Sequence, residues 1–248
     1  MKKSALALFA LTYLGVLIAN APASLLSVAL TQVSNGQATF ADAQGTLWQG
    51  EAIPLIQMKQ AAPIALHRLH WRITPQSLFS GKLRAALHWD NAAAPIQASL
   101  TLQQLELQQF SATLPAELLG GVAPLLRPAQ LRGILQIHSE QLILNAHHIN
   151  GNAVADWIDA SSSFSTLAPL GTYRITLAGM GDRLNASLST TSGALMLNGQ
   201  GGWSATQGLN FQGTASAAAD KTDELTELLN HLGPETAAGV HGITLSAH

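Results

Sequence analysis

Residues 65–73 have the sequence Ala-Leu-His-Arg-Leu-His-Trp-Arg-Ile, and residues 82–89 have the sequence Lys-Leu-Arg-Ala-Ala-Leu-His-Trp. Successive side chains of a β-strand point to opposite faces, so this alternation predicts two strands with one apolar face each. In the first strand Leu69, Trp71 and Ile73 share the apolar face. Between the strands, residues 74–81 predict one helical turn, with Thr, Pro and Gly placed as N-cap, first residue and stop.

The same alternation continues along the rest of the chain. One long strand is expected at 96–107, where a slip in the pattern near Gln103 and Gln104 indicates a β-bulge. Further strands are expected at residues 130–138, 141–149, 172–178, 183–190, 194–200, 209–215 and 242–246. Many strands at regular spacing with few helices predict a mainly β protein, with an antiparallel sheet that forms a sandwich or an open groove.

Helical signals are few after the N-terminal segment. Residues 115–120 predict a turn or two, and residues 222–233 predict a short helix that Thr222 caps and Gly233 ends. Its leucines form one apolar stripe. Core packing explains such a stripe, and a partner-binding face is the alternative.

The N-terminus begins with Lys2 and Lys3, followed by an almost unbroken apolar run from residue 4 to residue 19. A helix satisfies its backbone in lipid and the positive end stays in the cytoplasm. We therefore expect a cytoplasmic tip at 1–3, a transmembrane signal-anchor at 4–24 and a periplasmic β-rich domain at 25–248. Residues 20–33 are weakly polar and can prolong the anchor helix to the membrane interface.

Two alternatives to an anchor remain open. Ala19-Asn20-Ala21 matches the cleavage site of a signal peptide, although Pro22 is a poor residue after a cleaved bond. A soluble core helix is the second alternative, and the double lysine at the N-terminus argues against it.

Composition excludes several function classes. Charged residues make up 10% of the 248 residues, against roughly 25% in typical soluble domains, so the polarity comes from Gln, Asn, Ser and Thr. Beyond Lys2 and Lys3 the basic residues are scattered, which argues against nucleic-acid binding. The chain has no cysteine, so no disulfide supports its core.

The motifs of common catalytic and metal sites are absent from the sequence. Nine histidines suggest metal binding, but His67 and His70 are three apart on a strand, and the adjacent His147 and His148 diverge. Asp156 and Asp159 are expected to shape a loop. We therefore expect no catalytic, cofactor-binding or metal-binding residue and no cofactor. A small-molecule ligand is not expected, whereas a lipid is possible.

Four segments in order resemble one family. They are Gly45-Thr-Leu-Trp-Gln-Gly50, the stretch 69–83, Trp157 with 167–174, and the late helix followed by Gly242-Ile-Thr-Leu245. Together they are similar to the N protein of the bacterial type II secretion system. The resemblance implies an accessory inner-membrane component, with one spanning helix and a β-rich periplasmic domain, in a machine that exports folded proteins across the outer membrane. Its implied partners are other inner-membrane components of that system.

These motifs also have a plain structural interpretation. Gly45 and Gly50 are expected to bracket a short strand, and Trp48 is expected to be buried against the sheet, with an exposed docking residue as the alternative. The alternative function is an AsmA-like protein that handles lipid or bridges the envelope, because a curved sheet with one apolar face can cover acyl chains.

Overall fold

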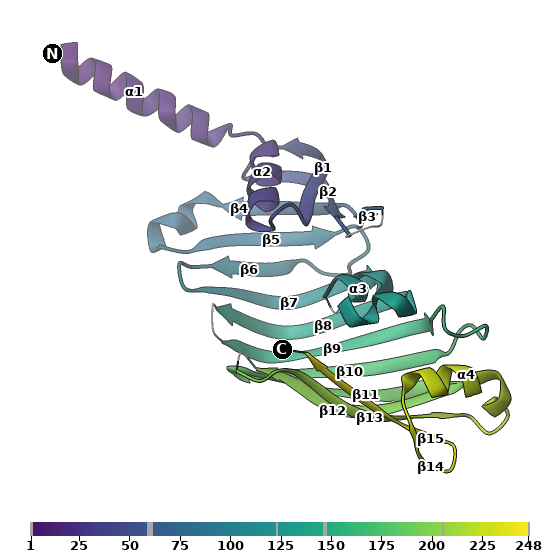
Figure 1. The fold of residues 1–248 in the computed structure, drawn as a ribbon. Helices are drawn as coiled ribbons and strands as arrows, with labels where there is room; N and C mark the ends of the chain where they lie inside the picture. Colours follow the sequence, from purple (N-terminus) through teal and green to yellow (C-terminus); the bar gives the residue numbers. More distant parts are fainter. Residues whose placement is uncertain (1, 59–61, 123, 146–147, 205, 248) are drawn as a thin grey trace. The chain divides into compact units, whose positions relative to one another are not determined.

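The computed structural model describes residues 2–58, 62–122, 124–145, 148–204 and 206–247 (Figure 1). Its internal contacts divide the chain into two compact units, Met1–Leu102 and Gln103–His248, here called unit 1 and unit 2. Strands dominate both units, and every strand pairing that the structure gives is antiparallel. The predicted mainly β class with a few short helices is therefore confirmed.

Unit 1 begins with two helices, α1 (Lys2–Ala19) and α2 (Ser24–Val33). They are separate elements: Pro22 forms a bridge with Thr46, and the Ala23 amide donates to the Gly45 carbonyl. The expectation that residues 20–33 prolong the first helix is therefore wrong, because this joint is tied to the sheet. Among the described residues, no helix combines the length and the apolarity required of a membrane span.

The sheet of unit 1 has the order β1-β2-β4-β5-β6, and β3 pairs with β2 beside β4. Its strands are β1 (Ala38–Gly45), β2 (Gln49–Ile56), β3 (Ile64–Ala65), β4 (Leu69–Thr74), β5 (Leu83–Trp89) and β6 (Ile96–Leu100). Between β4 and β5 lies the 3-10 helix η1 (Pro75–Ser80), which ends at Gly81 with φ of 70°. The turn predicted at 74–81 is confirmed.

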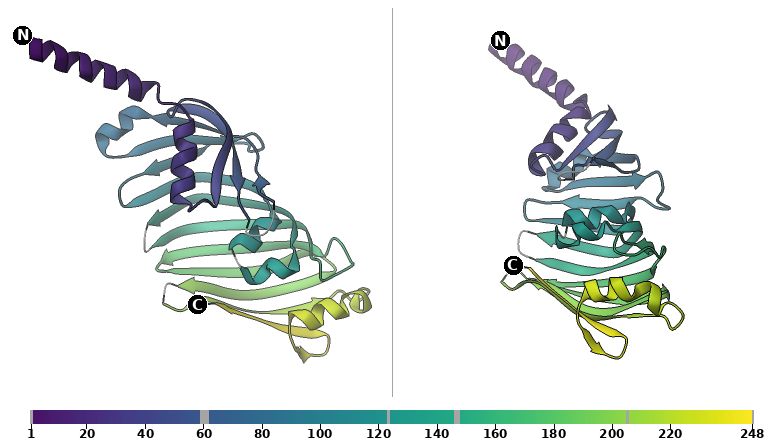
Figure 2. Two further views of the ribbon diagram at one scale, coloured as in Figure 1. Left: turned by 45° about the horizontal axis from the view of Figure 1, so that its top comes forward. Right: turned by 45° about the vertical axis from the view of Figure 1, so that its right-hand side comes forward.

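The apolar face of this sheet packs under α2. Trp71 is 4% exposed and stacks on Phe40 at a centroid distance of 5.9 Å, with Ala23 and Ala52 buried beside it. Leu69 is also buried and Arg72 is exposed, as the alternation predicts. Figure 2 shows α2 lying across the strands that it covers.

Unit 2 holds nine described strands in the order β7-β8-β9-β10-β11-β12-β13-β15-β14. They are β7 (Gln104–Pro115), β8 (Arg132–Asn145), β9 (Ile149–Ser161), β10 (Gly171–Gly181), β11 (Arg183–Gly193), β12 (Leu195–Ser204), β13 (Gly208–Ala217), β14 (Glu235–Ala237) and β15 (Val240–Ala247). Its helices are η2 (Ala116–Leu118), α3 (Leu119–Val122), η3 (Pro124–Ala129) and α4 (Thr222–Leu232).

The sheet of unit 2 has one apolar and one polar face, which the strand register shows directly. One row of paired residues crosses from β7 to β15 as Ala112, Ile137, Ala155, Ile175, Leu188, Gly199, Gly213 and Ile243. The next row, which points to the other face, is Thr113, Gln136, Asp156, Arg174, Ser189, Asn198, Thr214 and Gly242.

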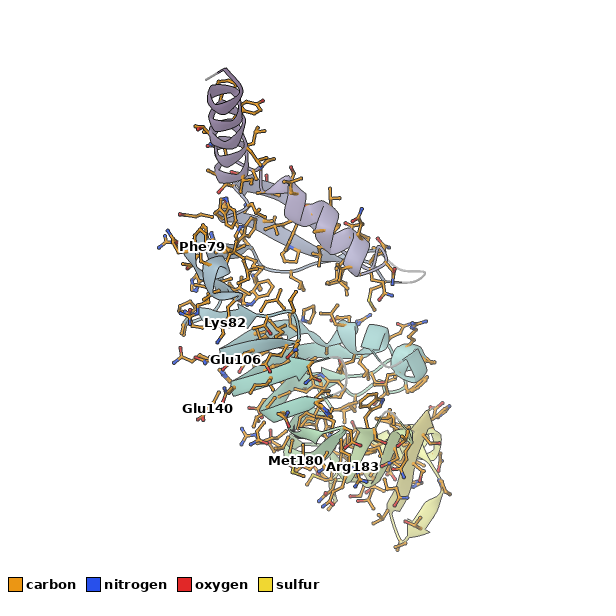
Figure 3. All side chains as sticks on the ribbon, turned by 90° about the vertical axis from the view of Figure 1, so that its left-hand side faces the viewer. Phe79, Lys82, Glu106, Glu140, Met180 and Arg183 are labelled. Carbon is orange, nitrogen blue, oxygen red and sulfur yellow. The ribbon has the colours of Figure 1, made fainter. Side chains whose placement is uncertain are left out.

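Helix α4 covers the apolar face at the C-terminal strands. Its buried residues Leu225, Leu228 and Leu229 form one cluster with Leu195, Ala215 and Ile243 of the sheet. The predicted core role of the leucine stripe is confirmed. The predicted cap is wrong, since Lys221 occupies the N-cap position and no side chain caps the helix. Figure 3 shows the side chains of Glu106 and Glu140 projecting outward from the strands of unit 2.

Two strand boundaries also differ from the prediction. Residues 96–107 form two strands, β6 and β7, so the slip near Gln103 marks a strand end rather than a bulge. Residues 132–145 form one strand with a register shift between His138 and Leu142, where the sequence suggested two. In each unit the described strands make a single sheet, which favours the open arrangement over a sandwich.

Candidate functional site

An ionic cluster on unit 1 brings together charged side chains from strands β1, β2 and β4 and from the turn after β5. Arg68 Nη2 lies 2.7 Å from Asp42 Oδ2, and Arg68 Nη1 lies 2.9 Å from Glu51 Oε1. His70 Nδ1 lies 3.1 Å from Glu51 Oε2, and its Nε2 lies 2.6 Å from Asp90 Oδ1. The cluster therefore links four segments through one guanidinium, one imidazole ring and three carboxylates.

The electrostatics of this cluster follow from the pairing. The hydrogen bond from the Arg68 guanidinium, with a second from Gln44, lowers the pKa of Asp42, and the same contact raises the pKa of Arg68. Both ring nitrogens of His70 face carboxylate oxygens. An ionised carboxylate only accepts hydrogen bonds, so the 2.6 Å contact with Asp90 requires a hydrogen on Nε2 of the His70 ring.

The ionic cluster borders an open depression of about 660 Å³, lined by residues that include His70, His88, Arg72 and Gln49. The His70 and His88 rings lie 6.4 Å apart between centroids. No nucleophile with a base and an orienting group is assembled there. Within the described part of the chain, no group of three or more His, Cys, Asp or Glu side chains is arranged to hold a metal ion. The arrangement binds the strands to one another by charge.

The remaining histidines have separate roles. His67, His138 and His148 are exposed, whereas His241 is buried with Nδ1 2.9 Å from the Gly233 carbonyl. His231 stacks on Phe164 at 5.5 Å. His147 and His248 lie outside the described residues. Sequence reasoning missed the ionic cluster, because it joins His70 to carboxylates 19 and 20 residues away whose strand register only the fold supplies.

The acidic pair in β9 is a correction to the sequence analysis. Asp156 lies in mid-strand directly opposite Arg174, with Oδ1 2.7 Å from the guanidinium Nε. Asp159 adopts φ of 51° at a register shift near the end of the strand. The predicted loop at these residues is therefore wrong. The contact with Asp156 raises the pKa of Arg174, as expected for an exposed cross-strand ion pair.

The Gly45–Gly50 segment is also different from the prediction. It forms the turn between β1 and β2 rather than a strand of its own. Gly45 has φ of 87°, and a Cβ there would lie 2.5 Å from the Gln49 carbonyl oxygen, so the turn requires glycine. Trp48 is only partly buried, and its indole N–H donates to the Ile18 carbonyl at 2.8 Å. The predicted burial of Trp48 against the sheet is wrong, because the side chain ties the end of α1 to the turn.

Strand β15 leaves one edge of the unit 2 sheet open. It pairs with β13 along its length, but β14 pairs only with its first residues, Val240 and His241. In the described part of the chain, residues 243–247 have no strand on the side away from β13. These residues have the sequence Ile-Thr-Leu-Ser-Ala, which contains no charge and no proline.

Strand β1 forms an edge of the unit 1 sheet and is built differently. Strand β1 carries Asp42 at φ of 49° within a register shift between Ala41 and Gln44. A charged bulge of this kind is a standard protection of sheet edges against pairing with other chains. Residues 243–247 have no charged residue and no bulge, so the β15 edge is better suited than the β1 edge to pairing with an extended segment.

Comparison with known proteins gives one family. The family model described as type II secretion system (T2SS), protein N matches residues 37–244, most of the chain. The chain belongs to the type II secretion system protein N family. No curated protein and no solved structure matches it. The matched region includes the Gly45–Gly50 turn, the ionic cluster, α4 and β15 as far as Thr244.

Membership in this family assigns the chain to a secretion machine rather than to a known enzyme class. The segments that carry the resemblance have structural roles in the fold: the Gly45–Gly50 segment is a turn, 69–83 is the β4–β5 pair, and residues 222–233 are the helix that covers the sheet and the glycine that ends it. Tyr173, in the third segment, is buried, donates its hydroxyl to the Leu195 carbonyl at 3.0 Å, and has a raised pKa because of that burial.

Proposed function

We propose that this protein is an accessory inner-membrane component of the type II secretion system, which scaffolds other inner-membrane components on the periplasmic side. Family membership supports the secretion role. The absence of any assembled catalytic group among the described residues supports a binding role over a catalytic one. The observation that carries the proposal is the open, uncharged edge of β15.

The N-terminal helix supports placement at the membrane. In α1 the side chains of Phe9, Tyr13, Leu14, Val16, Leu17 and Ile18 are each exposed by half or more. Successive residues of a helix are turned by about 100°, so these side chains cover more than half of its circumference, a wider arc than a single apolar stripe. Lys2 and Lys3 precede them. Such a helix is suited to lipid, with the lysines cytoplasmic and residues 25–248 periplasmic.

Strand addition is the docking mode that the β15 edge favours. An extended segment that pairs with a free edge gains main-chain hydrogen bonds, and its alternate side chains meet the two faces of the sheet. Beside β15 those faces differ, since Ile243 and Leu245 belong to the α4 cluster while Thr244 and Ser246 are exposed. The expected partner segment therefore alternates apolar and uncharged polar residues.

Site-specific photocrosslinking tests this proposal. A photoreactive residue at Ser246, in cells that assemble the secretion system, is expected to crosslink another inner-membrane component. Ser187 is a matched control, because it is an exposed serine on the same polar face in the interior strand β11. No adduct at Ser246, or equal adducts at both positions, contradicts docking at this edge.

One observation favours lipid handling as a second candidate. Ile137, Ile175 and Leu188 lie on the apolar face of unit 2 but outside the cluster that α4 covers, and they are only half-buried. A phospholipid with a photoreactive acyl chain distinguishes the two functions in the full chain. Adducts on β8, β10 and β11 favour lipid handling, whereas adducts confined to α1 favour the scaffold.

A further inference from the structure

We propose that the end of unit 1 from which α1 leaves docks on the surface of an anionic membrane, through exposed apolar residues and cations at that end. This docking surface consists of Leu78, Phe79, Lys82, Arg84, Leu100 and Leu102. This proposal rests on the proposed anchoring of the chain by α1. It adds a second contact, between the folded part of unit 1 and the lipid.

The position of α1 relative to the sheet is set by the Gly45–Gln49 turn. The Leu47 amide donates to the Ala21 carbonyl at 2.7 Å, and the Trp48 indole N–H donates to the Ile18 carbonyl. These bonds hold the C-terminal end of α1 beside the turn that joins β1 to β2. The helix therefore leaves unit 1 at this end of the sheet.

The strand register brings the docking surface to the same end. Gln49 pairs with Arg72, and the Ile73 amide donates to the Trp48 carbonyl at 2.6 Å, so β4 finishes beside the turn and η1 follows it there. Leu83 pairs with Leu100, which places the start of β5 and the finish of β6 at this end as well. Residues that are up to 80 positions apart in the sequence thus meet near the base of α1.

The apolar members of the docking surface are unusually exposed. Phe79 is 97% exposed, Leu102 is fully exposed, and Leu78 and Leu100 are each about half exposed. Single exposed apolar residues are ordinary, but several at one end of a small sheet mark an interaction site. The tip that presents Phe79 is held in place, because the buried Ser77 hydroxyl donates to the Thr74 carbonyl and accepts from the Arg84 amide.

The charges at this end fit an anionic surface. Lys82, Arg84 and Arg72 are exposed and have no ion-pair partner among the described residues. Figure 3 shows Phe79 and Lys82 projecting on the same side of unit 1. The acidic residues of unit 1 are Asp42, Glu51 and Asp90, and all three make contacts within the ionic cluster rather than with these cations.

Lipid is a better occupant than a protein partner on three grounds. The surface combines apolar side chains with unpaired cations, which is the combination that anionic interfaces attract. It is continuous with the helix that the proposed function places in the bilayer. The partly buried Trp48, a residue type that favours the headgroup region, lies in the turn at the same end of the sheet.

Fluorescence quenching in vesicles tests the docking surface directly. The chain has no cysteine, so one cysteine introduced into the full chain can carry a single dye. The labelled position is Gln76 in η1. Asn91, at the opposite end of β5, is the control, and Leu14 reports on α1. The vesicles contain phosphatidylethanolamine, phosphatidylglycerol and a phospholipid with a nitroxide on its acyl chain. Loss of fluorescence at Gln76 but not at Asn91 is expected.

The outcomes separate this proposal from the anchor itself. Quenching at Leu14 with none at Gln76 overturns the docking surface and leaves the anchor intact. Absence of quenching at both positions contradicts the anchor and the docking surface together. Adding Phe79→Ser and Leu102→Ser to the Gln76-labelled chain is expected to restore its fluorescence, and unchanged quenching would show that these residues do not make the contact.

Discussion

At the scale of single residues, two tryptophans of unit 1 have opposite roles. Trp71 is buried under α2 and stacks on Phe40, whereas Trp48 is partly exposed and holds the end of α1 by one hydrogen bond. Alternation placed Trp71 correctly on the apolar face. It carried no information on Trp48, because the residue lies in a turn whose partner is 30 positions away.

Substitution of the two tryptophans by alanine is expected to separate these roles. Trp71→Ala removes a buried large side chain and should lower the free energy of unfolding by about 3–5 kcal/mol. Trp48→Ala removes one partly exposed hydrogen bond and should lower it by about 1 kcal/mol. Thermal unfolding of both variants in the same detergent measures the difference. A loss for Trp48→Ala as large as that for Trp71→Ala would mean that Trp48 is a core residue.

Asp42 is expected to make stability depend on pH in the acidic range. Its pKa is lowered below the ordinary value of 3.8 by Arg68, so the folded state binds a proton less readily than the unfolded chain. The stabilisation is therefore fully present above 3.8 and is lost as the pH falls through the folded-state pKa. Melting temperatures of the natural chain and of Asp42→Asn should differ at neutral pH and converge in acid; a constant difference would exclude this coupling.

At the scale of elements, the strands that the sequence predicted are those with regular alternation, including β4, β5 and β10 to β13. The missed strands are β1, β2, β9 and β14, and the short β3 was merged with β4 in the single strand predicted at 65–73. Strand β1 has small residues and a bulge at Asp42, β2 contains Pro54, and β9 is rich in Asn, Ala and Gly. Long-range pairing supplies the hydrogen bonds of these strands, and local pattern does not report it.

Substitutions on the apolar side of helix α4 are expected to destabilise unit 2 strongly. Leu225 is fully buried against β13 and β15, so Leu225→Ala should lower the free energy of unfolding by about 2–5 kcal/mol. Glu227→Ala on the exposed side of the same helix is the matched control, and its effect should stay within about 0.5 kcal/mol. Urea unfolding monitored by circular dichroism provides the test, and equal effects would remove α4 from the core.

At the scale of the whole molecule, the sequence led to the mainly β class and to the secretion family through four short segments in order. It gave no route to the docking surface of unit 1 or to the open edge of β15. Both depend on how the strands pair. Pairing decides which residues of distant strands meet at one end of the sheet and which strand forms its edge. Patterns along the chain predict faces of strands but not their neighbours.

Co-purification from cells that assemble the type II secretion system tests the central claim most directly. The full chain, isolated from such cells in detergent, is expected to bring with it another inner-membrane component of the system. Thr244→Lys with Ser246→Lys should abolish that recovery, because charged side chains on an edge strand oppose strand addition. Ser187→Lys on an interior strand should leave the recovery unchanged. Full recovery with the edge variant, or recovery of no secretion component by the natural chain, would contradict the account.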